Sequence, residues 1–180
     1  MNIIAPPRET KDTSRDATFH RIADQLGLIA NEDYSTAGQY APFVRCDNQI
    51  FVSGQLPKLS GEIAVRGIIG PDVSVESGRL AAMICAARCL ALLQRALGTL
   101  DQIRTIPRIG VYMQSDHAFE EQSAVADGAS EVLYSVFGTA GAHARTSLSV
   151  FRLPRYAAVE VDLIAVVRPD FALDGSKASR

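Results

Sequence analysis

The chain has 180 residues, 47% of them hydrophobic, and a chain of this length forms one ordinary domain that buries about 70% of the surface of its unfolded form. Its formal net charge is only -2 at pH 7, which argues against the strongly basic surface of a nucleic-acid-binding domain. Its three cysteines lack CxxC spacing, which argues against a disulfide framework and favours a reducing compartment, so we expect a cytoplasmic protein.

The N-terminal part predicts a tail followed by a helix. Residues 1–12 contain prolines and mixed charges, with no apolar segment of the signal-peptide type. Over residues 16–28, apolar side chains recur at the spacing of an amphipathic helix. We therefore divide the chain into a tail and appended helix (1–30), a single main domain (31–170) and a C-terminal tail (171–180).

A hairpin is expected at the start of the main domain. The apolar runs 43–46 and 49–53 flank Asp47 and Asn48. Both residues tolerate left-handed backbone, which suits a tight two-residue turn. The two runs therefore predict paired antiparallel strands.

A long helix is expected over Val75–Leu97. Ser74 suits its N-cap and Gly98 its C-terminal end. The apolar run 80–93 is interrupted by Arg88 and falls short of the roughly 20 residues that a bilayer span requires. We expect the buried helix of a soluble protein, with no membrane partner.

The remaining elements complete an α+β fold. Residues 106–113 predict a strand, 119–137 a second main helix, and 144–153 and 159–168 two further strands. This order predicts a mixed β-sheet with the two main helices packed on one face and the N-terminal helix added to them.

The last two strands carry the most informative side chains. Alternation places Arg145, Ser147 and Ser149 on one face of the first strand, and Glu160 and Asp162 on one face of the second. We expect these two strands to pair. A guanidinium that forks onto a carboxylate, near an acid that exchanges protons with water, predicts a site for a small anionic substrate.

Several segments in the same order closely resemble the RidA/YjgF family. The matching segments are Tyr40 ahead of a strand, Val-Ser-Gly-Gln-Leu-Pro at 52–57, Ala-Arg-Thr-Ser at 144–147, Leu-Pro at 153–154 and Val-Glu-Val-Asp at 159–162. The chain resembles a longer branch of the family, with an added N-terminal segment and a Gly-x-His-Ala-Arg motif. The resemblance implies the chorismate-mutase-like fold and a homotrimer whose subunits associate around their sheets, with pockets at the subunit boundaries.

The resemblance also implies roles for the charged residues. Arg145 would grip the carboxylate of the substrate; the alternative is a structural contact with a loop carbonyl or a neighbouring acid. Asp162 aligns with the water-activating glutamate of the family, but its side chain is one methylene shorter. Glu160 could compensate for this difference, and the alternative for both acids is a solvated polar face.

The remaining site residues are expected to line the pocket. Tyr40 would cover the substrate, although an aromatic residue packing at a strand edge is the alternative. At Gly54 and Gln55 the backbone would approach the ligand closely. Ser147 stands in place of a cysteine and Asp127 in place of an asparagine, and both would contact the substrate.

The implied activity is hydrolysis of reactive 2-imino or 2-enamino acids to 2-keto acids and ammonia, without a cofactor. A non-catalytic module that binds small carboxylates or a protein partner is the alternative, and an endoribonuclease ranks third. No metal is expected, because His20, His117 and His143 lack ligand spacing, and no nucleic acid is expected as a partner, because the net charge is only -2. Cys85 and Cys89 are expected to pack in the core.

Overall fold

The computed structural model describes residues 14–29, 32, 34 and 38–169, and the predicted tails at 1–12 and 171–180 lie outside them. The helices are α1 (Arg15–Leu26), α2 (Val75–Leu97) and α3 (Gln122–Phe137), with short 3-10 turns at Leu100–Gln102, Gly138–Gly141 and Pro154–Tyr156. The strands are β1 (Phe43–Cys46), β2 (Gln49–Gln55), β3 (Lys58–Leu59), β4 (Glu62–Ile63), β5 (Ile103–Gln114), β6 (Ala144–Val150) and β7 (Val159–Val167). The main sheet has the order β1-β2-β7-β5-β6, in which β5 and β6 are parallel and the other neighbours antiparallel. The predicted α+β class is confirmed.

Helix α1 is capped at both ends and tied to the rest of the fold. The Ser14 hydroxyl accepts a hydrogen bond from a backbone N–H of the first turn, and Gly27 takes the left-handed conformation that ends the helix. The Asp16 carboxylate accepts hydrogen bonds from the Leu100 N–H at 2.9 Å and from the Thr99 hydroxyl. The helix therefore packs as the predicted addition, starting one residue and ending two residues earlier than expected.

Helix α2 has the predicted bounds and forms the centre of the core. Ser74 accepts a hydrogen bond from the Ser77 N–H at 3.2 Å, and Gly98 closes the helix with a φ of 82°. By length and composition the helix could cross a membrane, but 72% of its most apolar window is buried inside the fold. It is the core helix of this domain, as predicted.

The strands follow the prediction with shifted ends. The hairpin of β1 and β2 pairs Phe43 with Val52, and Asp47 at its turn has a φ of 51°. Strand β5 is longer at both ends than expected. Strand β6 ends at Val150 instead of residue 153, because the Leu153 N–H turns inward and donates to the buried Gln114 side chain at 3.1 Å.

Helix α3 starts three residues later than predicted. Before it, the Asp116 carboxylate accepts a hydrogen bond from the Ala118 N–H at 2.9 Å, and the Asp116 carbonyl accepts one from the Phe119 N–H at 3.1 Å. This local turn uses the backbone groups that a helix would need. The apolar face of α3 then packs on α2 and β5 as predicted.

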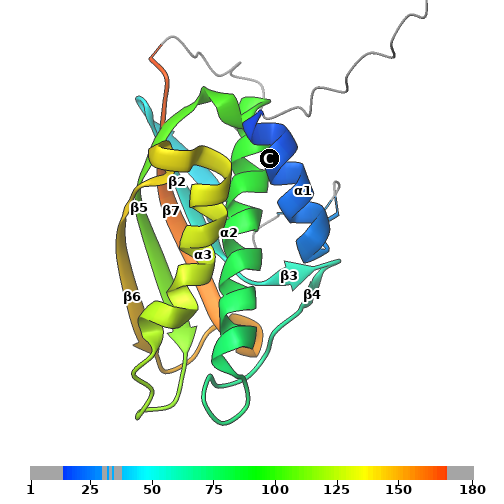
Figure 1. Ribbon diagram of the computed structural model, residues 1–180, viewed down its shortest axis with the longest axis vertical. Helices are drawn as coiled ribbons and strands as arrows, with labels where there is room; N and C mark the ends of the chain where they lie inside the picture. The colour runs from blue at the N-terminus through cyan, green and yellow to red at the C-terminus, as the bar shows by residue number, and fades with distance from the viewer. Residues whose placement is uncertain (1–13, 30–31, 33, 35–37, 170–180) are drawn as a thin grey trace, which may run out of the picture.

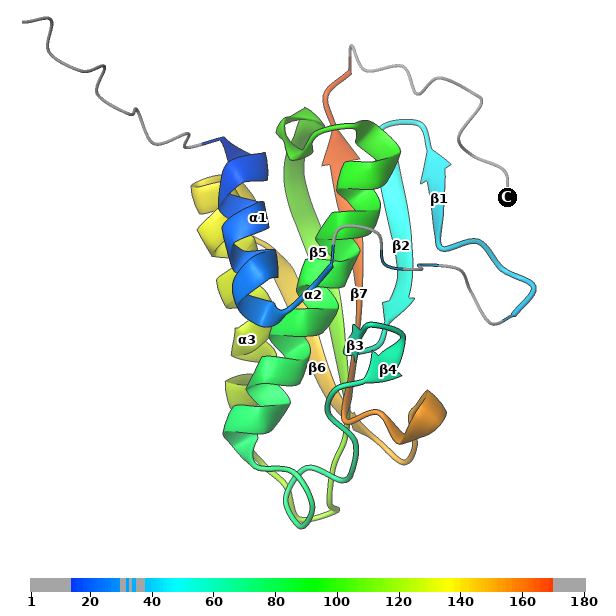
Figure 2. The same ribbon diagram turned by 90° about the vertical axis from the view of Figure 1, so that its right-hand side faces the viewer.

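All three helices lie on the same side of the main sheet, with α1 outside α2 and α3 (Figures 1 and 2). The side chains of the sheet that face the helices form the core, as in β7, where every second residue is buried. The other face of the sheet carries none of the helices in the described part of the chain. Val44, Phe51 and Leu148 are 57%, 41% and 50% exposed there, so this open face offers apolar surface to a partner.

Candidate functional site

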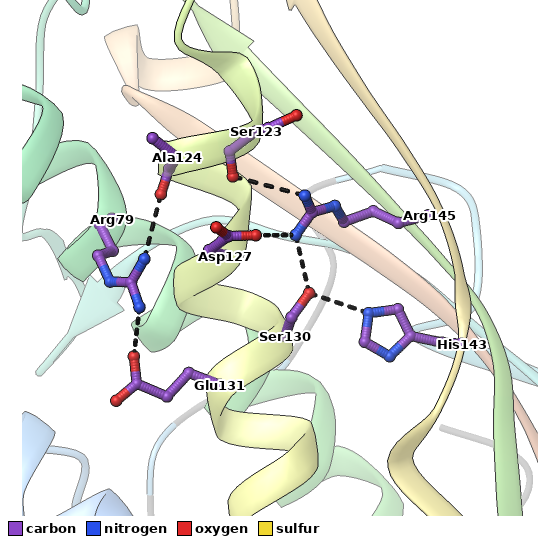
Figure 3. A network of polar contacts seen from close by, with 8 residues as sticks. All are labelled: Arg79, Ser123, Ala124, Asp127, Ser130, Glu131, His143 and Arg145. Atoms are coloured by element: carbon purple, nitrogen blue, oxygen red, sulfur yellow. Dashed lines mark hydrogen bonds and ion pairs between the residues drawn. The ribbon is translucent and has the colours of Figure 1, made fainter.

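Arg145 lies on the edge strand β6, beside α3. It pairs with Ile109 of β5, which is buried under the helices, so the Arg145 side chain also points to the helix-covered face. Its Nη1 donates to Asp127 Oδ1 at 2.7 Å and to Ser130 Oγ at 2.9 Å, and its Nη2 lies 3.5 Å from the Ser123 carbonyl oxygen (Figure 3). Helix α3 therefore holds the guanidinium in place from within the same chain.

His143 sets the direction of the hydrogen bonds at Ser130. Its Nδ1 lies 2.6 Å from the Gly141 carbonyl oxygen, which can only accept, so Nδ1 donates in this contact. In the tautomer whose single proton is on Nδ1, Nε2 accepts from the Ser130 hydroxyl at 2.9 Å. The Ser130 oxygen is left to accept from Arg145, which can only donate. The series from Gly141 through His143 and Ser130 therefore fixes the position of Arg145.

Asp127 pairs with Arg145 across the surface between α3 and β6. The Arg145 side chain is 20% exposed and that of Asp127 is 54% exposed. The charge of Arg145 is thus balanced by a neighbouring acid, which is the structural contact left open by the sequence. Because the pair is partly exposed, an anionic ligand that reaches Arg145 also meets the charge of Asp127.

The two predicted carboxylates lie on the opposite face of the sheet. The expected pairing of the strands that carry Arg145 and Glu160 is wrong, because β5 lies between β6 and β7. Residues 151–158 connect β6 to β7 and pass the C-terminal end of β5, which lies between these two strands. Glu160 and Asp162 alternate with buried residues of β7, so they point away from the helices. Within one chain, Arg145 and the two acids therefore form two separate groups.

Both carboxylate oxygens of Asp162 accept hydrogen bonds from β5. Its Oδ1 accepts from the Gly110 N–H at 3.2 Å, and its Oδ2 accepts from the Tyr112 hydroxyl at 3.0 Å. Burial and the contact with Asp162 raise the pKa of Tyr112, so this hydroxyl keeps its proton and continues to donate. These bonds make Asp162 a fixed partner of Gly110 and Tyr112.

Glu160 lies over the bare backbone of β2. A Cβ atom built on Gly54 would collide with the Glu160 carboxylate, so the glycine makes room for this side chain. Burial raises the pKa of Glu160, and the charge of Asp162 adds to the increase. A half-buried carboxyl group with a raised pKa suits acid–base chemistry. The geometry therefore favours Glu160 over Asp162, to which the sequence analysis assigned the leading role.

Tyr40 precedes the hairpin that contains this glycine, and Gln55 follows the glycine directly. Tyr40 precedes β1 and is 58% exposed, and the carbonyl of the following Ala41 accepts a hydrogen bond from the Ser53 hydroxyl at 2.7 Å. The buried Gln55 side chain donates to the carbonyls of Ser53 and Gly54 at 3.0 and 3.3 Å. Gln55 therefore points into the fold and supports the strand at Gly54, whereas Tyr40 lies on the surface.

Two members of the Arg145 group were not predicted. His143 was considered only as a metal ligand, yet it precedes Arg145 by two residues in extended chain, as Ser147 follows it by two on the same face of β6. Ser130 lies three residues after Asp127, which places both on one face of α3. These two spacings in the sequence could have indicated that His143 and Ser130 lie near Arg145 and Asp127.

Two of the three cysteines lie in the core of the fold, whereas Cys46 on β1 is exposed. Cys85 and Cys89 are fully buried on α2, and their thiols face the carbonyls of Val159 and Val161 on β7 at 3.6 and 3.5 Å. Burial raises the pKa of both thiols, which keeps them as neutral packing groups. Among the described residues, no group of three His, Cys, Asp or Glu side chains is placed to hold a metal ion.

Two hollows between the helices do not coincide with the predicted site. One of about 740 Å³ opens between α1 and α2, and one of about 180 Å³ lies among the three helices. Neither Arg145 nor Glu160 is among the described residues that line them. Neither of these two hollows therefore encloses Arg145 or Glu160.

Comparisons with known proteins agree with this fold. Residues 21–167 match the family model described as "YjgF/chorismate mutase-like, putative endoribonuclease". Protein TCP17 of Trypanosoma cruzi is 39% identical over 165 residues, which cover 91% of this chain and 97% of that protein. The structure of protein Atu1372 of Agrobacterium tumefaciens is 38% identical, with a TM-score of 0.77 over 86% of this chain and 95% of that one. The structure of "a putative endoribonuclease" of Shewanella oneidensis is 29% identical, with a TM-score of 0.77 over 83% and 99% of the two chains.

Proposed function

This chain belongs to the YjgF/chorismate mutase-like family, and on that premise we propose that it hydrolyses reactive 2-imino and 2-enamino acids to 2-keto acids and ammonia. The observation that carries the proposal is a held arginine at the sheet edge together with a half-buried Glu160 of raised pKa. Arg145 supplies a fork for a carboxylate, and Glu160 supplies an acid that exchanges protons with water. The reaction needs no cofactor, and we place the protein in the cytoplasm.

We further propose that the complete site forms between two copies in a homotrimer. Arg145 and Glu160 face opposite sides of one sheet, so a single chain does not present both to one small molecule. The open face carries exposed Val44, Phe51 and Leu148, which are suited to burial against another subunit. In a closed ring, the sheet edge of one subunit meets the open face of the next. Arg145 of one copy then shares a pocket with Glu160 of its neighbour.

The hydrolysis can be written with these residues in named roles. Arg145 binds the substrate carboxylate, and Tyr40 and Ser147 wall the pocket. The oxygen of water bonds to the carbon of the protonated imine while the Glu160 carboxylate takes one proton from that water. Glu160 then gives this proton to the nitrogen. The C–N bond breaks as the new hydroxyl group passes its proton back to the Glu160 carboxylate, and Glu160 gives this proton to the departing ammonia, which leaves the 2-keto acid and ammonium. Since such imines also hydrolyse in water, positioning and electrostatics suffice for the required rate gain.

The test generates 2-aminoacrylate in solution and follows its loss with and without the protein. Wild type should accelerate the loss, and Arg145→Ala should reduce the acceleration about 30-fold or more, because removing one partner of a shielded charge pair costs about 2–5 kcal/mol. Arg145→Lys should recover little, since an ammonium group cannot reproduce the fork. The exposed Arg104→Ala is the matched control and should behave as wild type. Equal loss with and without wild-type protein contradicts the proposal.

A non-catalytic module that binds small carboxylates is the second candidate. Two observations favour it: Asp127 already balances Arg145, and both oxygens of Asp162 are engaged. Glu160→Gln separates the two functions. An enzyme loses turnover but still binds 2-oxobutyrate, whereas a binding module has no turnover to lose.

Endoribonuclease activity, which the family description names, ranks third. The net charge of -2 supplies no general attraction for a polyanion. His20 lies on α1, His117 in the turn before α3 and His143 before β6. These separate positions give no histidine pair for phosphodiester cleavage within the described fold.

A further inference from the structure

The Arg145 group presents a cation and an anion side by side on one surface. The Arg145 Nη1 and the Asp127 Oδ1 are 2.7 Å apart, and the Asp127 side chain is 54% exposed. Nη1 is used by Asp127 and Ser130, whereas the contact of Nη2 with a described residue is a long one of 3.5 Å to the Ser123 carbonyl oxygen. A carboxylate can therefore approach the Nη2 side of the guanidinium while Asp127 stays beside it (Figure 3).

The charges of this surface favour one class of ligand. Arg145 and Asp127 together carry no net charge. A ligand with a carboxylate alone adds a second anion next to Asp127, and two like charges at close range repel. A ligand that also has a protonated nitrogen, on the carbon next to its carboxylate, gives Asp127 a cation to bind.

We propose that Asp127 makes this site selective for zwitterions, namely 2-iminium acids and α-amino acids, over 2-keto acids of the same length. The carboxylate of the ligand binds Arg145 and its nitrogen donates to Asp127. This inference rests on the proposed function only in placing the substrate carboxylate at Arg145.

The selectivity has a consequence for turnover. The protonated imine is a zwitterion, whereas the 2-keto acid that hydrolysis leaves is an anion and its nitrogen departs as ammonium. Asp127 therefore favours the substrate and disfavours the product at the same arginine. Product inhibition by 2-keto acids should be weak in the wild type and stronger in a variant without this charge.

Calorimetry with L-2-aminobutyrate and 2-oxobutyrate tests the inference, because the two probes share the carboxylate and the chain and differ in the nitrogen. The wild type should bind the amino acid more tightly. In Asp127→Asn, which keeps an oxygen for Arg145, the ratio of the two affinities should shift about tenfold or more toward the keto acid. Glu131→Gln is the matched control, since it removes a charge one turn along α3 that pairs with Arg79 at 2.6 Å. Its ratio should equal that of the wild type.

Three outcomes overturn the inference: a ratio in Asp127→Asn within about twofold of wild type, a wild type that prefers the keto acid, or a wild type that binds neither probe. Because binding is measured without turnover, failure of the proposed function is distinguishable. If the ratio of affinities shifts as expected but the protein has no effect on 2-aminoacrylate, the inferred selectivity stands and the proposed enzymatic function is wrong. If the wild type turns over 2-aminoacrylate but the ratio of affinities is unchanged in Asp127→Asn, the proposed enzymatic function stands and the inferred selectivity is wrong.

Discussion

The buried ion pair between Arg88 and Glu32 leads to a quantitative stability prediction. Arg88 lies on α2 and donates to a Glu32 carboxylate oxygen and, at 3.1 Å, to the Lys58 carbonyl. The side chains of the pair are 3% and 2% exposed, and the Arg88 guanidinium carbon lies 4.6 Å from the centre of the Tyr34 ring. The pair therefore ties the core helix to the segment that follows α1 and to β3.

Glu32→Gln keeps the shape of the side chain but removes the charge that compensates Arg88. A guanidinium left uncompensated at this depth destabilises a fold by about 3–5 kcal/mol. For a domain of this size each kcal/mol lowers the melting temperature by about 2–4 °C, so the variant should melt about 6–20 °C below wild type. Circular dichroism during thermal and urea unfolding, at one protein concentration, measures the change. Glu62→Gln is the control, because the Arg66–Glu62 pair is 52% and 81% exposed and should matter by less than about 0.5 kcal/mol.

A double replacement separates the charges from the packing. Glu32→Leu with Arg88→Met removes both charges and fills the space with apolar groups, so it should be more stable than Glu32→Gln. The reasoning is refuted if Glu32→Gln loses less than about 1 kcal/mol, since the buried charge would then not need its partner. It is also refuted if the double variant is as unstable as the single one.

Three further predictions concern titration and the Arg145 group. Burial raises the pKa of Asp16, but its hydrogen bonds outweigh this and lower the pKa overall, so the stability that Asp16 contributes is present above its unfolded pKa and is lost as pH falls through the folded value. Asp16→Asn should therefore reduce the acid dependence of stability, and an unchanged stability–pH curve would contradict this. Burial raises the pKa of Glu160, so its contribution is present below the unfolded pKa and is lost as pH rises through the folded value. Glu160→Gln should thus raise the melting temperature near neutral pH but not below about pH 4, and the same shift at both pH values would be evidence against it. Ser130→Ala removes the oxygen that positions Arg145 and should weaken 2-oxobutyrate binding about tenfold in calorimetry; wild-type affinity would show that Ser130 is not needed.

The local features of the fold could be predicted, but the neighbours of each strand could not. Ser74 and Gly98 mark the ends of α2 as expected, because capping depends on residues close in sequence. Alternation shows which side chains share a face of a strand, and it did so for Glu160 and Asp162. It does not show which strands are adjacent, so the position of β5 between β6 and β7 was missed.

The site could be predicted by residue but not by arrangement. Arg145 stands out in the sequence, whereas its hydrogen bond to Ser130 depends on how α3 packs beside β6. Asp162 and Glu160 look equivalent along β7. They differ because Gly110 and the hydroxyl of Tyr112 on β5 engage only Asp162, and this pairing is a property of the folded sheet.

Complementation between two inactive variants tests most directly whether the site is shared between copies. Arg145→Ala and Glu160→Gln are each expected to lose turnover of 2-aminoacrylate. If they are unfolded together in equal amounts and refolded, about a quarter of the boundaries in a ring should combine an intact Arg145 with an intact Glu160 from the next copy. We predict that the mixture recovers about a quarter of the wild-type rate, while each variant refolded alone stays inactive. A mixture that stays inactive, although it refolds into mixed oligomers, would contradict a site built from two chains.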